Sequence, residues 1–178
     1  VLFRSWIEGF TDGADPEYVE QILPLAATEL AGAGSILDIG CGEGQLSRSA
    51  VAAGSAFVVG IDPTWNQLRV AASRGGGVRY LRSGAADLPF ADGSFDAVVA
   101  CLVFEHIREV DSALAEVARV LRPGGRFCFF LNHPLLQTPG SGWIDDRVLD
   151  PPEQYWRIGD YLIEQESLEE VEKDVFIP

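Results

Sequence analysis

Residues 36–44 read ILDIGCGEG, an apolar run that meets an acid and then carries glycine at every second position. Asp38 stands inside the end of the apolar run, and Gly40, Gly42 and Gly44 follow it. A helix-like segment starts directly afterwards. A strand, a glycine loop and a helix in this order bring bare backbone close to a ligand at the carboxyl edge of a parallel sheet. The ligand would be either a phosphate or a cation.

Strand-like and helix-like segments alternate along the rest of the first 132 residues. A helix is expected to start at Asp15, Pro16 and Glu17, because these residues supply a cap, a first-turn proline and an acid facing the helix dipole. Four apolar segments follow the first one, at 56–61, 78–81, 95–103 and 126–132, and helical spacing covers 45–53, 64–74 and 112–121. This alternation predicts an α/β fold with a parallel sheet of five strands.

The character of the chain changes after Pro134. Aromatic residues stand among acids and prolines without a clean strand pattern, namely Trp143, Tyr155, Trp156, Tyr161 and Phe176. Two interpretations remain open for this segment: a cap or lid, and an irregular surface extension or connection.

Composition excludes several classes of partner. The 178-residue chain has a formal net charge of -14, so nucleic acid is not expected to bind. The apolar runs are too short for membrane insertion, and three cysteines and two histidines without zinc-type spacing indicate neither a disulfide framework nor a metal site. We therefore expect a cytoplasmic protein. The chain has no methionine, which leads us to expect that it is part of a longer protein.

The glycine spacing favours a cation over a phosphate. A dinucleotide fold requires Gly-x-Gly-x-x-Gly, and the third glycine position is here occupied by Gln45. Asp38 would also repel a pyrophosphate, whereas it would tolerate a positively charged, phosphate-free ligand.

Five ordered motifs carry a resemblance to a known family: LDIGCGEG, VVGIDPT, ADLPFADGSFDAVV, FEHI and EVARVLRPGGRF. Over residues 16–135 the chain resembles the class I S-adenosylmethionine-dependent methyltransferases, in particular the small-molecule group related to quinone and sterol methylases. The resemblance implies an α/β fold with a Rossmann-like, doubly wound, mostly parallel sheet that lacks its last two strands. It implies methyl transfer from S-adenosyl-L-methionine to an O, N or C atom of a small molecule, with S-adenosyl-L-homocysteine as product.

The same resemblance implies one methyltransferase domain over 1–178, incomplete at its C-terminus, with a cofactor-binding core at 16–135 and a cap, lid or connecting segment at 136–178. The family normally adds two strands beside the fifth, so we expect the full protein to be longer, with the edge of the fifth strand exposed if the end is genuine. The oligomeric state stays open.

The resemblance assigns cofactor-binding roles to positions along the chain. Asp62 would hold the ribose hydroxyls with its two oxygens. Pro63, with Trp65 or Leu68, would line the adenine. Relatives commonly have Gly-Asp-Ala where this chain has Ser83, Gly84 and Ala85, so adenine recognition would rest on the backbone near Ala85 and Ala86 or on Asp87. The methionyl end would meet Asp38, Gly40, Cys41, Gly42, Gly44, Cys101 and Leu102.

Two histidines are candidate catalytic bases. His106 lies in the FEHI motif, which in the resembling family borders the transferable methyl group, and His133 follows the fifth strand, where the family usually contacts substrate. For His106, a helix-start residue bonded to the backbone is an equally good interpretation. Two alternative functions stay open: a non-catalytic or truncated S-adenosylmethionine-binding relative, and an NAD(P)-dependent Rossmann oxidoreductase.

Overall fold

The computed structural model of the protein describes residues 16, 18–163, 169–172 and 175–177. The chain forms two compact units, residues 1–130 and 131–178. The helix start predicted at Asp15 and Glu17 lies outside the described residues, and Phe176 belongs to a short strand of the second unit.

The first unit is built on one parallel sheet. Its strands lie in the order β3-β2-β1-β4-β5, and every neighbouring pair is parallel. The strands are β1 (Ser35–Ile39), β2 (Phe57–Ile61), β3 (Arg79–Leu81), β4 (Phe95–Cys101) and β5 (Leu121–Phe130). The predicted α/β fold with a parallel sheet of five strands is confirmed. The chain order reverses at β1, which pairs with β2 on one side and β4 on the other, and ligands bind at such reversal points.

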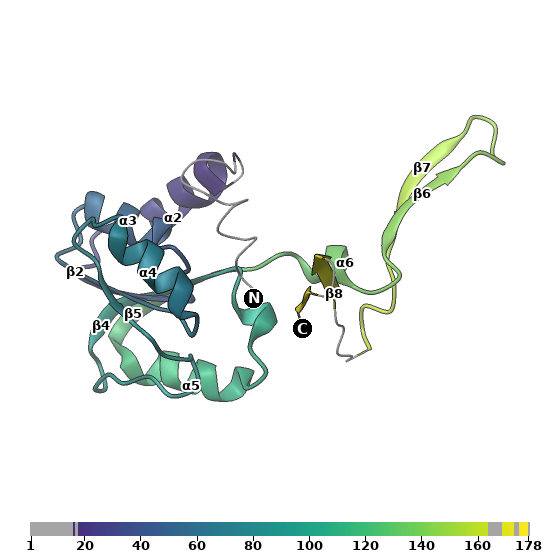
Figure 1. Cartoon of the computed structure of the whole chain (residues 1–178). Coiled ribbons are helices and arrows are strands. Elements are labelled where there is room, and N and C mark those ends of the chain that lie inside the picture. Colours follow the sequence, from purple (N-terminus) through teal and green to yellow (C-terminus); the bar gives the residue numbers. More distant parts are fainter. Residues whose placement is uncertain (1–15, 17, 164–168, 173–174, 178) are drawn as a thin grey trace. The chain divides into compact units, whose positions relative to one another are not determined.

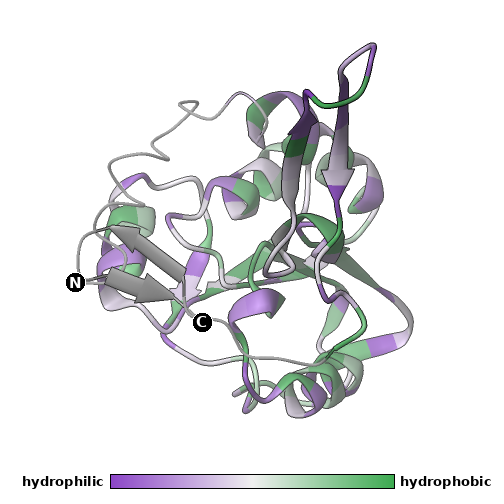
Figure 2. Cartoon of the chain, turned by 90° about the vertical axis from the view of Figure 1, so that its right-hand side faces the viewer, coloured by the Kyte–Doolittle hydropathy of each residue, from purple (hydrophilic) through white to green (hydrophobic). Residues whose placement is uncertain are grey.

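Helices cover both faces of this sheet (Figure 1). One face carries α2 (Leu23–Glu29), α3 (Gln45–Ala52) and α4 (Trp65–Ser73), and the other carries α5 (Val110–Val120). A π-helical turn, η1 (Tyr18–Ile22), precedes α2, and a short 3₁₀ helix, η2 (Phe104–His106), follows β4. Hydrophilic and hydrophobic residues alternate along the helices (Figure 2), as expected for helices with one buried face.

The strands in the middle of the sheet are apolar because both of their faces are covered. All five residues of β1 are buried. Ile36 and Val58 pack toward α2 and α3, whereas Leu37 and Val59 pack in the cluster that includes α5. Asp38 is the one charged residue in this central strand.

The strand β5 is longer and less regular than predicted. It begins at Leu121, so the predicted turn RPGG forms part of it, and it ends at Phe130, before the predicted end at 132. Phe95 pairs with Leu121 while Ala97 pairs with Arg126, which shows that the RPGG residues form an irregularity in the pairing. Within the described sheet β5 is a terminal strand, and Phe129 on it is 47% exposed.

The second unit contains a hairpin that the sequence did not predict. After α6 (Pro134–Gln137), β6 (Gly142–Asp146) pairs antiparallel with β7 (Glu153–Arg157), so the expected lack of a strand pattern was wrong here. Trp143 lies opposite Trp156 with ring centroids 5.5 Å apart, and such cross-strand aromatic pairs stabilise hairpins. A second antiparallel pair joins β8 (Glu169–Glu172) and β9 (Val175–Ile177).

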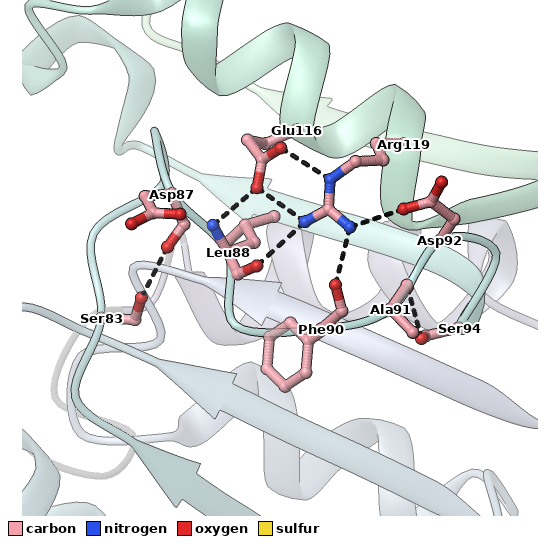
Figure 3. Close-up of polar contacts among 9 residues, drawn as sticks. All are labelled: Ser83, Asp87, Leu88, Phe90, Ala91, Asp92, Ser94, Glu116 and Arg119. Atoms are coloured by element: carbon pink, nitrogen blue, oxygen red, sulfur yellow. Dashed lines mark hydrogen bonds and ion pairs between the residues drawn. The ribbon is translucent and has the colours of Figure 1, made fainter.

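A network around Arg119 holds the long connection between β3 and β4 (Figure 3). The guanidinium group donates to the carbonyl oxygens of Leu88 and Phe90 at 2.9 and 2.7 Å. It also donates to both carboxylate oxygens of Glu116 at 2.7 Å and to Asp92 at 2.9 Å. Glu116 in turn accepts the Leu88 N–H at 2.7 Å, and its bonds to Arg119 and Leu88 lower the pKa of Glu116 to about 2. The connection that carries Ala85 and Ala86 is therefore fixed to α5.

In the described part of the chain, no helix is both long enough and apolar enough to cross a membrane.

Replacing Arg119 by lysine tests the network. Lysine keeps the charge but lacks the planar fork, so it cannot serve Glu116 and both carbonyl oxygens together. We expect Arg119→Lys to lower the melting temperature by a few degrees. The matched control is Arg122→Lys, because Arg122 is more exposed and bonds to Asp96 and the Gly93 carbonyl. Equal melting temperatures for the two variants would contradict this role for Arg119.

Candidate functional site

Two buried acids lie at the carboxyl ends of adjacent strands. Asp38 in β1 is 2% exposed, and Asp62, directly after β2, is 8% exposed. The pairing of Asp38 with Gly60 on β2 and with Val99 on β4 places the ends of β1, β2 and β4 side by side. Both acids therefore lie at the same edge of the sheet, and their roles in cofactor binding stay predictions.

Asp38 is held from the following helix. The Ser47 hydroxyl on α3 donates to Asp38 Oδ2 at 2.5 Å. Burial raises the pKa of Asp38 to about 7, and the Ser47 hydrogen bond, which favours the ionised form, offsets only part of this effect. The nearby charge of Asp62 raises the pKa further. Ionised Asp38 would therefore be stabilised by a cation.

The glycine loop between β1 and α3 has left-handed backbone at Gly40, Gly42 and Gly44. A Cβ atom at Gly40 would collide with the Val103 side chain, whereas one at Gly42 would meet no atom within 4 Å. Glycine at 40 is thus required by packing, and glycine at 42 leaves the backbone open to a ligand.

Asp62 ties this loop to β2. Its Oδ2 accepts the Gly42 N–H at 3.1 Å and its Oδ1 accepts the Thr64 N–H at 2.7 Å. Burial raises the pKa of Asp62, although both backbone hydrogen bonds act in the opposite direction. Each carboxylate oxygen has a second acceptor position, so Asp62 can still bind a pair of hydroxyl groups.

Glu43 fixes the other side of the loop. Arg48 bonds to the Glu43 carbonyl oxygen at 2.6 Å and to its carboxylate at 3.2 Å. Arg74, which directly follows α4, forms an ion pair with the same carboxylate. The loop is therefore held by β2 through Asp62 and by α3 and α4 through Glu43.

The end of β4 carries Cys101 and Leu102. Leu102 has a φ of 55°, a strained value for a leucine, and its N–H donates to the Phe130 carbonyl oxygen at 2.9 Å. Burial raises the pKa of Cys101 to about 12, so this thiol stays protonated and is not a nucleophile. Strained backbone is common where a protein binds a ligand, and Leu102 and Cys101 were predicted to contact the ligand through their backbone. That contact stays a prediction.

Tyr18 is a site residue that sequence reasoning missed. Its side chain forms a hydrogen bond with Cys101, and burial, together with the charges of Cys101 and Asp38, raises the pKa of the Tyr18 hydroxyl. Helical spacing places Tyr18 in the first predicted helix and gives no sign that it belongs to a site. Only the fold brings it to the end of β4.

Among the described residues, several buried side-chain oxygens have no hydrogen-bond partner. They include the carbonyl oxygen of the Gln67 side chain, Oε1 of Glu43 and both carboxylate oxygens of Glu105. Such groups are rare in folded proteins and indicate places where a ligand or water completes the bonding. None of these oxygens was assigned a role from the sequence.

The other predicted site residues differ in their surroundings. Cys41 is buried, and its Sγ lies 3.7 Å from the Gly42 carbonyl oxygen, so it contributes packing and backbone. Pro63 is exposed and its carbonyl oxygen accepts a bond from Arg82. Ala85 packs against the core, Ala86 is half-buried, and His106 ends η2. His133 belongs to the second unit, where its Nδ1 accepts the Leu135 N–H at 3.2 Å and caps α6.

The electrostatics of this edge suit a cationic ligand. The Gly42 N–H, which a phosphate would use, is already donated to Asp62. Among the described residues, no lysine or arginine contributes to the pKa shifts of Asp38, Asp62 or Cys101. The described residues also contain no group of three or more histidine, cysteine or acidic side chains that could hold a metal ion.

The raised pKa of Asp38 predicts a stability that falls as pH rises. Its pKa is about 7 in the folded protein and 3.8 in a solvated chain. Between these values the unfolded chain loses the proton while the folded protein keeps it, so the free energy of unfolding decreases by about 1.4 kcal/mol per pH unit. Urea unfolding of the ligand-free protein at about pH 5 and about pH 7 measures this decrease.

The control for this experiment is Asp38→Asn, which keeps the shape of the side chain and cannot titrate. Glu116, whose pKa is lowered from 4.5 to about 2 on folding, contributes equally to the wild-type protein and to Asp38→Asn, so the difference between the two isolates Asp38. A wild-type protein that loses no more stability than Asp38→Asn over the window would show that Asp38 is not titrating there.

Comparisons with known proteins identify the family of the chain. A demethylmenaquinone methyltransferase from Thermobifida fusca is 35% identical over 147 residues, which are 74% of this chain and 62% of that protein. An O-methyltransferase from Aspergillus nomiae is 39% identical over 97 residues, which are 51% of this chain and 43% of that protein. The chain thus spans less than two thirds of the length of either relative.

A solved structure shares the fold. The crystal structure of an S-adenosylmethionine dependent methyltransferase from Mesorhizobium loti matches with a TM-score of 0.71 at 30% identity. The match covers 84% of this chain and 67% of that one.

The family profile described as a methyltransferase domain matches residues 37–129, more than half of the 178-residue chain. The matched range contains the glycine loop, Asp62 and the end of β4. The chain therefore belongs to the methyltransferase domain family, in its class I S-adenosylmethionine-dependent group.

Proposed function

We propose that this protein transfers a methyl group from S-adenosyl-L-methionine to an O, N or C nucleophile of a small molecule. The observation that carries the proposal is the pair of buried acids, Asp38 and Asp62, on either side of an open glycine loop. Among the described residues, no lysine or arginine contributes to the pKa shift of either acid. A cationic cofactor with a ribose diol matches both acids.

Each acid has a distinct part in holding this cofactor. Asp62 retains two acceptor positions for the ribose hydroxyls while it fixes the loop through Gly42. Asp38 supplies negative charge near the methionyl end, where Gly40, Cys41, Gly42 and Gly44 present backbone. Cys101 and Leu102 border the same end. Pro63, Ala85 and Ala86 are proposed to line the adenine.

When bound, the cofactor supplies a methyl group that is already activated on a sulfonium. The protein therefore has to align the acceptor with this methyl and exclude water, and orientation alone can supply about 7 to 11 kcal/mol. A base helps where the acceptor must lose a proton. The two candidate bases are His106, which ends η2, and His133, whose Nδ1 accepts the Leu135 N–H.

The acceptor is proposed to be a small molecule. The relatives are an O-methyltransferase and a demethylmenaquinone methyltransferase, which supports an acceptor with a hydroxyl group or a quinone ring. The core at 16–135 would hold the cofactor, and 136–178 would serve as cap, lid or connection. The three free cysteines are consistent with a reducing, cytoplasmic environment.

Isothermal titration of the cofactor tests the proposal directly. We expect saturable binding of S-adenosylmethionine and S-adenosylhomocysteine by the wild-type protein and no binding of NADH. Asp62→Asn removes the negative charge and one acceptor oxygen, so it should raise both dissociation constants roughly 10- to 100-fold. Asp111→Asn, a change at an exposed acid of α5, is the matched control and should leave them unaltered.

The outcomes separate the three candidate functions. Binding of NADH instead would support an oxidoreductase. Cofactor binding without S-adenosylhomocysteine formation from any hydroxylated aromatic, quinol or amine acceptor would support a non-catalytic relative. A folded protein that binds neither methyl-donor ligand would contradict the proposal.

A further inference from the structure

Glu105 is a buried carboxylate without a partner. It lies in η2, shortly after β4, and both of its carboxylate oxygens are shielded from solvent and accept no hydrogen bond from the residues that the structure describes. Burying a carboxylate without a donor is unfavourable, so a buried carboxylate of this kind marks a place where a ligand can supply the donor. No described residue supplies that donor to Glu105.

The neighbours of Glu105 locate that donor. The charge of Glu105 acts on Cys101, and so does the charge of Asp38. The Tyr18 side chain bonds to the same cysteine. Glu105 and Asp38 thus both lie near Cys101, at the end of β4, where the methionyl part of the cofactor is proposed to lie.

We infer that Glu105 binds the α-ammonium group of the cofactor's methionyl part. This inference rests on the proposed function. An ammonium group carries three N–H donors and a positive charge. A carboxylate forms its strongest hydrogen bonds with a group of this kind. The sulfonium has charge but no N–H.

Other acids at the site have donors of their own. Asp62 already accepts two backbone N–H groups, and Asp38 accepts the Ser47 hydroxyl. Glu105 alone among these three acids has both oxygens free for a ligand. It would therefore select ligands that carry an amino acid over nucleosides that do not.

The test compares two ligands in the full chain. S-adenosylhomocysteine carries the amino acid part, and 5′-methylthioadenosine keeps the adenosine and the sulfur but lacks the amino acid. We expect Glu105→Gln to raise the dissociation constant of S-adenosylhomocysteine roughly 10- to 100-fold, because a charge-assisted hydrogen bond is lost. Binding of 5′-methylthioadenosine should not change. The control Glu109→Gln, at an exposed acid beside η2, should alter neither constant.

A second measurement checks the fold of the variant. Because Glu105→Gln replaces a buried carboxyl group that has no partner among the described residues by an amide of the same shape, the ligand-free variant should melt at the same temperature as the wild-type protein or higher. A lower melting temperature would show that the carboxylate has a structural partner and would overturn the inference.

Four binding outcomes would also overturn it. Unchanged affinity for S-adenosylhomocysteine would remove the ammonium contact, and an equal loss for both ligands would assign Glu105 a general structural role. In a third titration, with S-adenosylmethionine, a loss of affinity for this ligand alone would place the carboxylate at the sulfonium. A wild-type protein that binds none of these ligands would overturn the proposed function as well, whereas the first three outcomes leave it standing.

Discussion

The structure of the site depends on one buried carboxyl group in the middle of the central strand. Asp38 occupies a position where an apolar residue would be more stable, since β1 is buried along its whole length. The Ser47 hydroxyl is its hydrogen-bond donor, and that donor comes from the helix that the glycine loop leads into. Strand, loop and helix are therefore joined through the same carboxyl group that is available to a cation.

The loop is rigid before any ligand arrives. Asp62 holds it from β2 through the Gly42 N–H, and Glu43 holds it from α3 and α4 through Arg48 and Arg74. A preorganised loop loses little conformational entropy on binding. The hydrogen bonds that create this order also occupy the Gly42 N–H, which is why the loop is suited to a cation and a diol and not to a phosphate.

Much of the fold could be predicted because its signals are local. Short apolar runs mark β1 to β4, and the spacing of Leu114, Val117 and Ala118 marks α5. The bond of Asp62 to Gly42, Tyr18 beside Cys101 and the unpaired oxygens of Glu105 could not be predicted, because they arise between segments distant in sequence or from burial. The β6–β7 hairpin was missed because neighbouring residues such as Trp143 and Ile144 are both apolar, and no alternation marks the strands.

The unfavourable features of the ligand-free site have a common physical consequence. Asp38 keeps its proton to about pH 7, Asp62 also has a raised pKa, and Glu105 has no donor. A cation that enters this edge favours the ionised forms of Asp38 and Asp62, so it lowers the pKa values of these two acids and releases the proton that Asp38 holds. By linkage, affinity for the cation rises with pH up to the pKa of Asp38 in the free protein and levels off above it. A positively charged ligand that binds the folded protein therefore raises its free energy of unfolding, and a ligand without positive charge does not relieve the buried acids in this way.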